Sequence, residues 1–199
     1  MKRAFDVVVA SALLTLLSPL ELLAFTAMAV DMLVRPSNRG GFLYREPRVS
    51  RGETFDLLKL RTLRSDVLAE ARGHARLLEL EPGNLTWAGR RILKPWYLDE
   101  LPQLWNVLRG DISLVGPRPW PPELVERQVA EGYDYRNRVA AGLTGPAQVA
   151  KGSGRAYLDL DLEYVEALHQ LNGWQLVHHD LGILRRTVTV LARGEGLEY

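Results

Sequence analysis

The sequence predicts a mainly α-helical protein with one small β-hairpin, anchored in a membrane by a kinked N-terminal helix. An apolar stretch from Val7 to Val30 is long enough to enter a bilayer. Two short segments of β type, Phe42–Tyr44 and Thr54–Leu60, flank Ser50-Arg51-Gly52, which has the composition of a hairpin turn. Several later segments show the apolar spacing of helices.

The composition limits the class of protein. The chain has 199 residues and a formal net charge of +1, so bulk binding to nucleic acid is not indicated. It contains no cysteine, which excludes disulfides, thiol catalysis and cysteine–zinc sites. The four histidines lack a metal-ligand spacing and are predicted to lie on the surface: His74, His169, His178 and His179.

The apolar stretch fits a transmembrane helix, a cleaved signal peptide or a re-entrant helix that enters and leaves one membrane face. Glu21 separates the apolar run from the candidate cleavage site Ala27-Met28-Ala29, which disfavours a signal peptide. Basic residues lie on both flanks, and this symmetry favours two cytoplasmic ends. They are Lys2, Arg3, Arg35 and Arg39.

Ser18-Pro19 divides this stretch in the middle, where proline is expected to kink the helix. Each half has about 12 residues and a length of roughly 18 Å, enough to enter one leaflet and return. We therefore predict a re-entrant membrane helix over residues 1–34 and a cytoplasmic domain with interfacial amphipathic helices over residues 35–199. Glu21 must be protonated, paired or close to protein, and the sequence does not decide among these.

Further elements follow in chain order. A loop is expected at 35–41, a polar helix at 64–80 ended by Glu81-Pro82-Gly83-Asn84, a helix from about Asp99 to a cap at Gly110, and helices at 158–171 and 177–192. The last helix carries an apolar stripe that fits either the core or a membrane surface. Its members are Leu181, Leu184, Val188 and Leu191.

Candidate chemistry lies at Asp99-Glu100. The simplest interpretation is that Asp99 caps a helix and Glu100 favours the positive end of that helix. An adjacent carboxylate pair can also hold Mg²⁺ or attack phosphorus. Arg118, between Pro117 and Pro119, is either an ordinary loop arginine or a fixed phosphate ligand. Lys59 and Arg61, at the end of the second strand, are a weak indication when taken alone.

Together these motifs resemble the monotopic phosphoglycosyl transferases, the bacterial sugar transferase family, over nearly the whole chain. The central block of some twenty residues is the most specific part of this resemblance. The matching segments are Phe5-Asp6, Ser18-Pro19, Lys59-Leu60-Arg61-Thr62, Leu98-Asp99-Glu100-Leu101-Pro102-Gln103-Leu104, the run from Gly110 to Pro119, Gly142-Leu143-Thr144-Gly145 with Ala147-Gln148-Val149, and Asp180 to Thr187.

The resemblance implies a mechanism. Asp99 is expected to attack the β-phosphate of a UDP-sugar and release UMP, and a polyprenyl phosphate then takes the sugar phosphate. Glu100 matches the second carboxylate of the family, and Mg²⁺ is expected at Asp99. The resemblance implies phosphate binding by Arg118, with Lys59 and Arg61 as further candidates, and a nucleotide or sugar contact for Gln148. The catalytic domain is expected on the cytoplasmic face of the inner membrane.

Two departures from the family pattern stand out. Lys94 occupies a place where the family usually has arginine and is the candidate for the substrate contact of that arginine, with Arg90 or Arg91 as alternatives. Pro146 replaces a usual tryptophan. Two alternatives therefore remain: a non-catalytic membrane scaffold, and a hydrolase of lipid-linked sugars, for which adjacent carboxylates are poorly arranged. A homodimer is compatible with the sequence, but no feature of the sequence indicates one.

Overall fold

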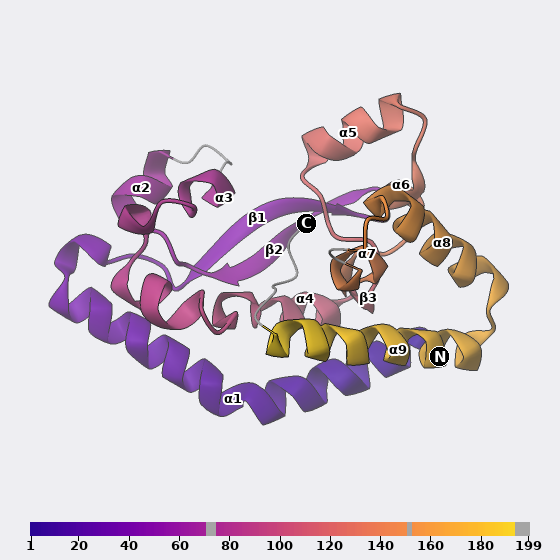
Figure 1. The fold of residues 1–199 in the computed structure, drawn as a ribbon. Coiled ribbons are helices and arrows are strands. Elements are labelled where there is room, and N and C mark those ends of the chain that lie inside the picture. The colour runs from indigo at the N-terminus through magenta and orange to yellow at the C-terminus, as the bar shows by residue number, and fades with distance from the viewer. Residues whose placement is uncertain (71–74, 151–152, 194–199) are drawn as a thin grey trace. The chain divides into compact units, whose positions relative to one another are not determined.

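The computed structural model describes residues 1–70, 75–150 and 153–193, which fall into two units. Unit 1 comprises Met1–Ser11, Pro47–Asp56 and Trp105–Tyr199, and unit 2 comprises Ala12–Glu46 and Leu57–Leu104. The boundaries between these units fall within the first helix, twice within the β-hairpin and once before Trp105. Figure 1 labels the helices and strands and colours them in chain order. The predicted mainly helical fold with a small hairpin is confirmed.

Helix α1 (Lys2–Val34) is a continuous α-helix that contains Pro19. Because proline has no N–H, the carbonyl of Thr15 loses its helical donor, and the Ser18 hydroxyl donates to that carbonyl at 2.8 Å. By length and composition this helix can cross a membrane, and large apolar side chains along it are exposed. The apolar N-terminal helix is confirmed, whereas the re-entrant kink stays a prediction.

Strands β1 (Leu43–Ser50) and β2 (Glu53–Leu60) form the predicted hairpin. Arg51 and Gly52 both have positive φ angles, 52° and 76°, as a two-residue type I′ turn requires. Strand β1 is longer than the predicted Phe42–Tyr44. Its charged residues and Pro47 hid the strand pattern, and a two-stranded sheet has only edge strands, where proline is tolerated.

Unit 2 continues with short helical segments around an apolar core. They are the 3₁₀ turns η1 (Pro36–Asn38), η2 (Pro82–Asn84) and η4 (Leu98–Glu100), helices α2 (Ser65–Glu70) and α3 (Ala75–Leu78), and the π-helical turn η3 (Gly89–Leu93). Residues of α1, including Ala24 and Met28, pack in this core with Leu60, Leu93 and Leu98. The predicted helix at 64–80 is found as α2 and α3, and its residues 71–74 lie outside the described residues.

In unit 1, β3 (Ser113–Val115) and β4 (Gly142–Thr144) pair in parallel, with Ser113 opposite Gly142 and Val115 opposite Thr144. The sequence did not predict this sheet, because three-residue strands are too short to show a pattern. A Cβ on Gly142 would lie 2.1 Å from the Gly116 nitrogen, so only glycine permits this close approach.

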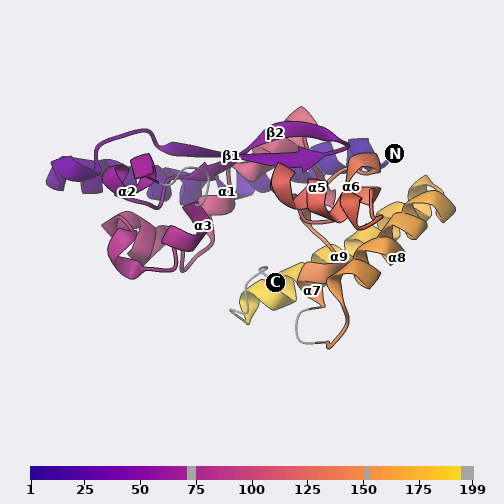
Figure 2. The same ribbon diagram turned by 90° about the horizontal axis from the view of Figure 1, so that it is seen from above.

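The remaining elements of unit 1 are helical (Figure 2). They are α4 (Gln103–Arg109), α5 (Pro122–Ala130), α6 (Tyr135–Arg138), α7 (Pro146–Val149), α8 (Tyr157–Gln170) and α9 (Gly173–Ala192). Gly110 has a φ of 94° directly after α4, which agrees with the predicted helix end there. The two final helices are close to their predicted bounds.

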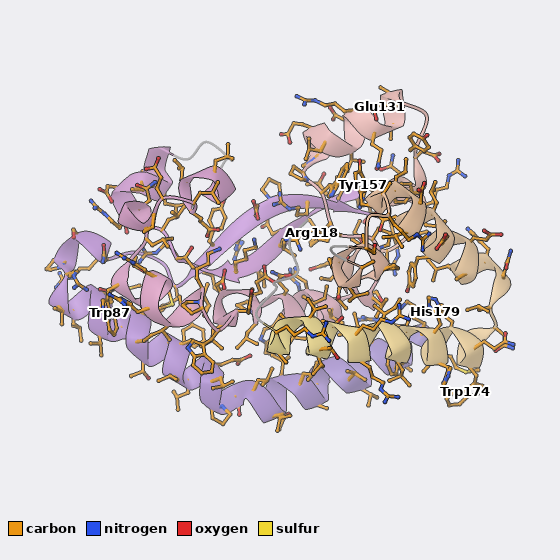
Figure 3. The ribbon with its side chains drawn as sticks, in the orientation of Figure 1. Trp87, Arg118, Glu131, Tyr157, Trp174 and His179 are labelled. Carbon is orange, nitrogen blue, oxygen red and sulfur yellow. The ribbon has the colours of Figure 1, made fainter. Side chains whose placement is uncertain are left out.

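The predicted apolar stripe of α9 is not its core face. Leu181 and Val188 are 42% and 67% exposed, whereas Ile183, Thr187 and Val190 are buried. The spacing of apolar residues does not reveal the buried face, because that face also contains the polar Asp180 and Thr187. Trp174, labelled in Figure 3, is 71% exposed on the same helix. The core interpretation of the stripe is therefore wrong, and a membrane-surface interpretation stays a prediction.

Candidate active site

Asp99 is almost completely buried, with 3% of its surface exposed. It lies in η4, which follows Tyr97 in a left-handed backbone conformation with a φ of 54°. Helix α4 begins only at Gln103, so Asp99 is not the N-cap of that helix. The capping interpretation of Asp99 is therefore wrong, because a 3₁₀ turn and Pro102 separate it from the helix. A buried carboxylate outside a cap requires another explanation.

Lys94 is the cationic partner of Asp99. Its Nζ lies 3.4 Å from Asp99 Oδ2 and 2.5 Å from Glu79 Oε2. Glu79 in turn accepts a hydrogen bond from the Thr62 hydroxyl at 2.5 Å. Sequence reasoning missed Glu79, because a glutamate near the end of a polar helix gives no local signal that it approaches Asp99.

The π-helical turn η3 presents Lys94 to this cluster. The Lys94 N–H donates to the Gly89 carbonyl at 3.0 Å, the five-residue spacing of a π-turn. A Cβ on Gly89 would lie 2.5 Å from the Thr62 carbonyl oxygen, so glycine is needed for this turn to pack against the end of β2. The turn therefore brings Lys94 and Thr62 into one cluster.

The surroundings raise the pKa of Asp99 to about 6. Burial is the largest cause, and the positive charges of Lys94 and Lys59 oppose it, whereas Glu100 and Glu79 add to it. Burial alone would lower the pKa of Lys94, but the charges of Asp99 and Glu79 outweigh it and raise that pKa. Lys94 therefore stays charged, and Asp99 is ionised at neutral pH but takes up a proton more readily than an exposed aspartate.

The two basic residues at the end of β2 have different surroundings. Lys59 forms an ion pair with Glu46 at 3.5 Å, and its charge also acts on Asp99. Arg61 is buried and donates hydrogen bonds to the carbonyls of Gly41, Leu63 and Asn38 and to the Ser65 hydroxyl. Its donors hold loops of unit 2 together, so we leave Arg61 out of the proposed substrate contacts.

The carboxylates of this cluster suit a magnesium ion that arrives with a phosphate substrate. Among the described residues, no group of three or more His, Cys, Asp or Glu side chains is arranged to hold a metal. Mg²⁺ in phosphate-transfer sites usually takes one or two carboxylates, and phosphate oxygens and water complete its octahedron. Asp99 and Glu100, which are adjacent in the chain, are the two carboxylates predicted to supply such a pair. Three histidines are exposed as predicted, and His74 lies outside the described residues.

In unit 1, the Pro117-Arg118-Pro119 loop is held at its backbone. The Gly142 N–H donates to the Pro117 carbonyl at 2.8 Å, and Arg136 donates to the Arg118 carbonyl. Pro117 and Pro119 are buried, whereas the Arg118 side chain, labelled in Figure 3, is half-buried. The loop therefore has a fixed backbone that carries an accessible guanidinium group.

Arg136 is the central residue of a buried network behind this loop. It donates to Gln128 Oε1 at 2.9 Å and to Asp161 Oδ2 at 2.7 Å, and its guanidinium group stacks 4.1 Å from the centre of the Trp120 ring. Asp161 is fully buried, and burial raises its pKa although Arg136 counteracts this. No sequence pattern indicated this ion pair.

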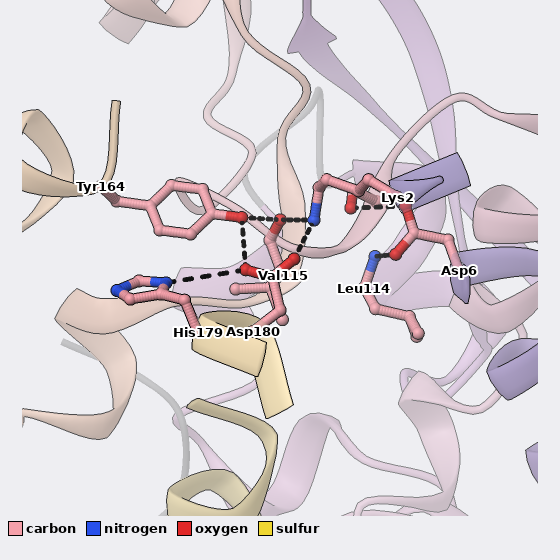
Figure 4. A network of polar contacts seen from close by, with 8 residues as sticks. Lys2, Asp6, Leu114, Val115, Tyr164, His179 and Asp180 are labelled. Atoms are coloured by element: carbon pink, nitrogen blue, oxygen red, sulfur yellow. Dashed lines mark hydrogen bonds and ion pairs between the residues drawn. The ribbon is translucent and has the colours of Figure 1, made fainter. Parts of the chain in front are cut away.

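Strand β3, which leads into the Arg118 loop, contacts the start of α1 (Figure 4). Asp6 accepts hydrogen bonds from the Ser113 hydroxyl at 2.7 Å and from the Leu114 N–H at 3.4 Å. Lys2 donates to the Val115 carbonyl at 3.2 Å and forms an ion pair with the buried Asp180. The N-terminal end of α1 is therefore bound to the strand that leads into the Arg118 loop.

Gln148 is fully buried in α7 of unit 1, and neither of its amide atoms has a hydrogen-bond partner among the described residues. A buried amide without partners costs about 1–3 kcal/mol. Direct contact with a soluble substrate would require this region to open, so the substrate role of Gln148 stays a prediction.

Comparison with known proteins identifies the family. The sequence profile described as bacterial sugar transferase matches residues 1–194. The chain belongs to this family. This match confirms the family resemblance. The motifs that indicated the resemblance include Asp99, Glu100 and Arg118 of this chain.

Two relatives of this sugar transferase chain have names that include undecaprenyl phosphate, and a third is named for exopolysaccharide production. A UDP-glucose:undecaprenyl-phosphate glucose-1-phosphate transferase of Caulobacter vibrioides is 37% identical over 96% of the chain and 69% of its own length. An undecaprenyl-phosphate galactose phosphotransferase of Salmonella typhimurium is 34% identical over 98% of the chain. The exopolysaccharide production protein ExoY of Sinorhizobium fredii is 35% identical over 98% of the chain and 87% of its own length.

The relatives differ in how much of their length the chain spans. The chain covers 42% of an uncharacterized sugar transferase of Haemophilus influenzae and 41% of the Salmonella protein. It covers most of the two shorter relatives. The chain therefore spans less than half the length of the Haemophilus and Salmonella relatives.

Proposed function

We propose that this protein transfers a sugar 1-phosphate from a UDP-sugar to a polyprenyl phosphate and releases UMP, through a covalent intermediate on Asp99. The observation that carries the proposal is a buried, ionisable Asp99 paired with Lys94 in a member of the sugar transferase family. The name of one relative supplies the class of both substrates: UDP-glucose as the donor and undecaprenyl phosphate, a polyprenyl lipid, as the acceptor.

In the first step, a carboxylate oxygen of Asp99 attacks the β-phosphorus of the donor. The bond from this phosphorus to the bridging oxygen breaks, and UMP leaves with that oxygen. Lys94 orients the carboxylate and keeps it ionised before the attack, and Arg118 and Lys59 bind phosphate oxygens. Asp99 and Glu100 would hold Mg²⁺, which when bound neutralises the charge on the diphosphate.

In the second step, an oxygen of the polyprenyl phosphate attacks the same phosphorus. The bond between Asp99 and phosphorus breaks, which restores the carboxylate and yields a polyprenyl diphosphosugar. Glu100, half-buried beside Asp99, assists the acceptor. A two-step scheme allows one pocket to serve a soluble donor and a lipid acceptor in turn.

We further propose that both ends of α1 lie on the cytoplasmic side of the inner membrane. Residues 1–11 pack within unit 1, and residues near Asp31 pack within unit 2. After α1 the chain passes between the units three more times, and α1 is the one helix among the described residues that is apolar and long enough to cross a bilayer. If α1 crossed the membrane, the three later connections between the units would also have to pass through lipid. Polar backbone in lipid is strongly disfavoured, so this arrangement is too.

Cysteine labelling tests this topology in a chain that has no native cysteine. We expect Ala4→Cys and Gly41→Cys, both at exposed positions, to react with a membrane-impermeant maleimide in inverted vesicles but not in intact spheroplasts. Arg138→Cys, on an exposed residue of unit 1, is the control for the cytoplasmic side. If Ala4→Cys reacted only in intact spheroplasts and Gly41→Cys only in inverted vesicles, α1 would span the membrane.

The proposed reaction is tested with purified protein in detergent, supplied with Mg²⁺, polyprenyl phosphate and a panel of UDP-sugars. We expect UMP release with one or a few donors and, without acceptor, a covalent sugar-phosphate adduct detectable by intact-protein mass spectrometry. A folded, lipid-reconstituted protein that releases no UMP from any donor would instead be a membrane-bound scaffold.

A further inference from the structure

A cavity of about 430 Å³ in unit 2 has no role in the proposed reaction. Four arginines line it, and its lining contains neither aspartate nor glutamate among the described residues. We call it the arginine cavity. Its lining includes Arg35, Arg64, Arg90, Arg91 and Trp87.

The arginine cavity has an excess of positive charge. Arg35 pairs with Asp31 at 2.8 Å, and Arg64 pairs with Asp66 at 2.5 Å. Arg90 and Arg91 have no ion-pair partner in the part of the chain that the structure describes. Guanidinium groups that face one cavity repel each other unless an anion lies between them, and phosphate accepts their paired N–H donors.

The position of the cavity relates it to the membrane. Arg35 directly follows Val34, the last residue of the apolar helix α1. The Ala88 N–H donates to Asp31 Oδ2 at 3.3 Å, so the segment that contains Trp87 packs against this end of α1. Trp87, labelled in Figure 3, is 44% exposed, and tryptophan is typical of membrane–water interfaces. With α1 placed in the membrane as proposed above, on which this inference rests, the cavity lies where α1 leaves the apolar layer, at the level of lipid phosphates.

The cavity is separate from the candidate active site by its residues. Neither Asp99 nor Glu100, Lys94 or Lys59 is among the residues that line it. We propose that the arginine cavity binds a phosphate group at the membrane surface, independently of the carboxylates that carry out transfer. The phosphate comes either from an anionic phospholipid or from a soluble diphosphate, and both have the chemistry that the four arginines recognise.

Thermal unfolding of the full chain measures this binding, because a ligand that binds only the folded state raises Tm. The probes are phosphatidylglycerol, added to mixed micelles of neutral detergent and phosphatidylcholine, and separately inorganic diphosphate. We expect one probe to raise the Tm of the native protein. The variant R90Q/R91Q, changed at two exposed side chains, is expected to bind that probe about tenfold more weakly or worse.

The variant R127Q/R138Q is the matched control, since it removes the same charge from exposed arginines of unit 1. It is expected to respond as the native protein does. A response to phosphatidylglycerol that R90Q/R91Q loses identifies a lipid phosphate, and a response to diphosphate that it loses identifies a soluble one. Equal responses of native protein and R90Q/R91Q to both probes, or an equal loss in R127Q/R138Q, would overturn the proposal.

Discussion

Replacing Asp99 by asparagine is expected to abolish transfer while making the folded protein more stable. Asparagine has nearly the same shape but cannot attack phosphorus, so UMP release and the covalent adduct should both disappear. Only 3% of the surface of Asp99 is exposed, and its pKa is raised from 3.8 to about 6. The charge of Asp99 therefore destabilises the folded state. This shift corresponds to about 3 kcal/mol at neutral pH, as an upper value. UMP release and Tm of the two proteins measure both effects.

The pH dependence provides the control. Below the unfolded pKa of 3.8, Asp99 is protonated in both states and its charge penalty is absent. As pH rises from there through about 6, the unfolded chain ionises first and the native protein loses stability relative to D99N. The same ionisation should make native transferase activity rise with pH through about 6. UMP release that survives in D99N would exclude Asp99 as the nucleophile.

Replacing Arg136 by methionine is expected to destabilise unit 1 strongly. The change leaves the fully buried Asp161 without its cation and removes the donor to the Arg118 carbonyl. Breaking one side of a buried ion pair typically costs about 3–5 kcal/mol. Tm and denaturant unfolding measure the loss, and the KM for the UDP-sugar should rise in preparations that remain folded, because the Arg118 loop loses its support.

Arg138→Met is the matched control for this prediction. Arg138 pairs with Asp134, the residue that precedes its short helix, but the Arg138 side chain is 70% exposed, so its loss should cost less than about 1 kcal/mol. The double variant R136M/D161L removes both buried charges and should be more stable than R136M alone. If R136M and R138M lose the same stability, the buried pair does not have the proposed importance.

Local patterns in the sequence predicted several parts of the fold. The apolar run of α1, the turn at Arg51-Gly52 and the helices α8 and α9 depend on residues close together in the chain, and periodicity reports such relations directly. The parallel pairing of β3 with β4 was not predicted. Its two strands are short and distant in sequence, and the close approach of Gly142 to Gly116 is visible only once they meet.

The candidate site divides in the same way. The sequence alone indicated Asp99, Glu100 and Arg118, because these residues lie within recognisable motifs. Glu79 beside Lys94, and Arg136 beside Asp161, join segments that are far apart in the chain. The sequence made Arg61 a candidate for phosphate binding, and only the folded chain shows that this side chain donates to loop carbonyls.

The sequence by itself therefore determined the family and the apolar N-terminal helix, and it predicted Asp99 and Glu100 as the reactive carboxylates. The tertiary structure decided that Asp99 is buried beside Lys94 instead of capping a helix, which face of α9 is exposed, and that four arginines share one cavity. The physical reason is that burial and electrostatic coupling depend on distances in space. The folded chain sets those distances between residues that no local pattern connects.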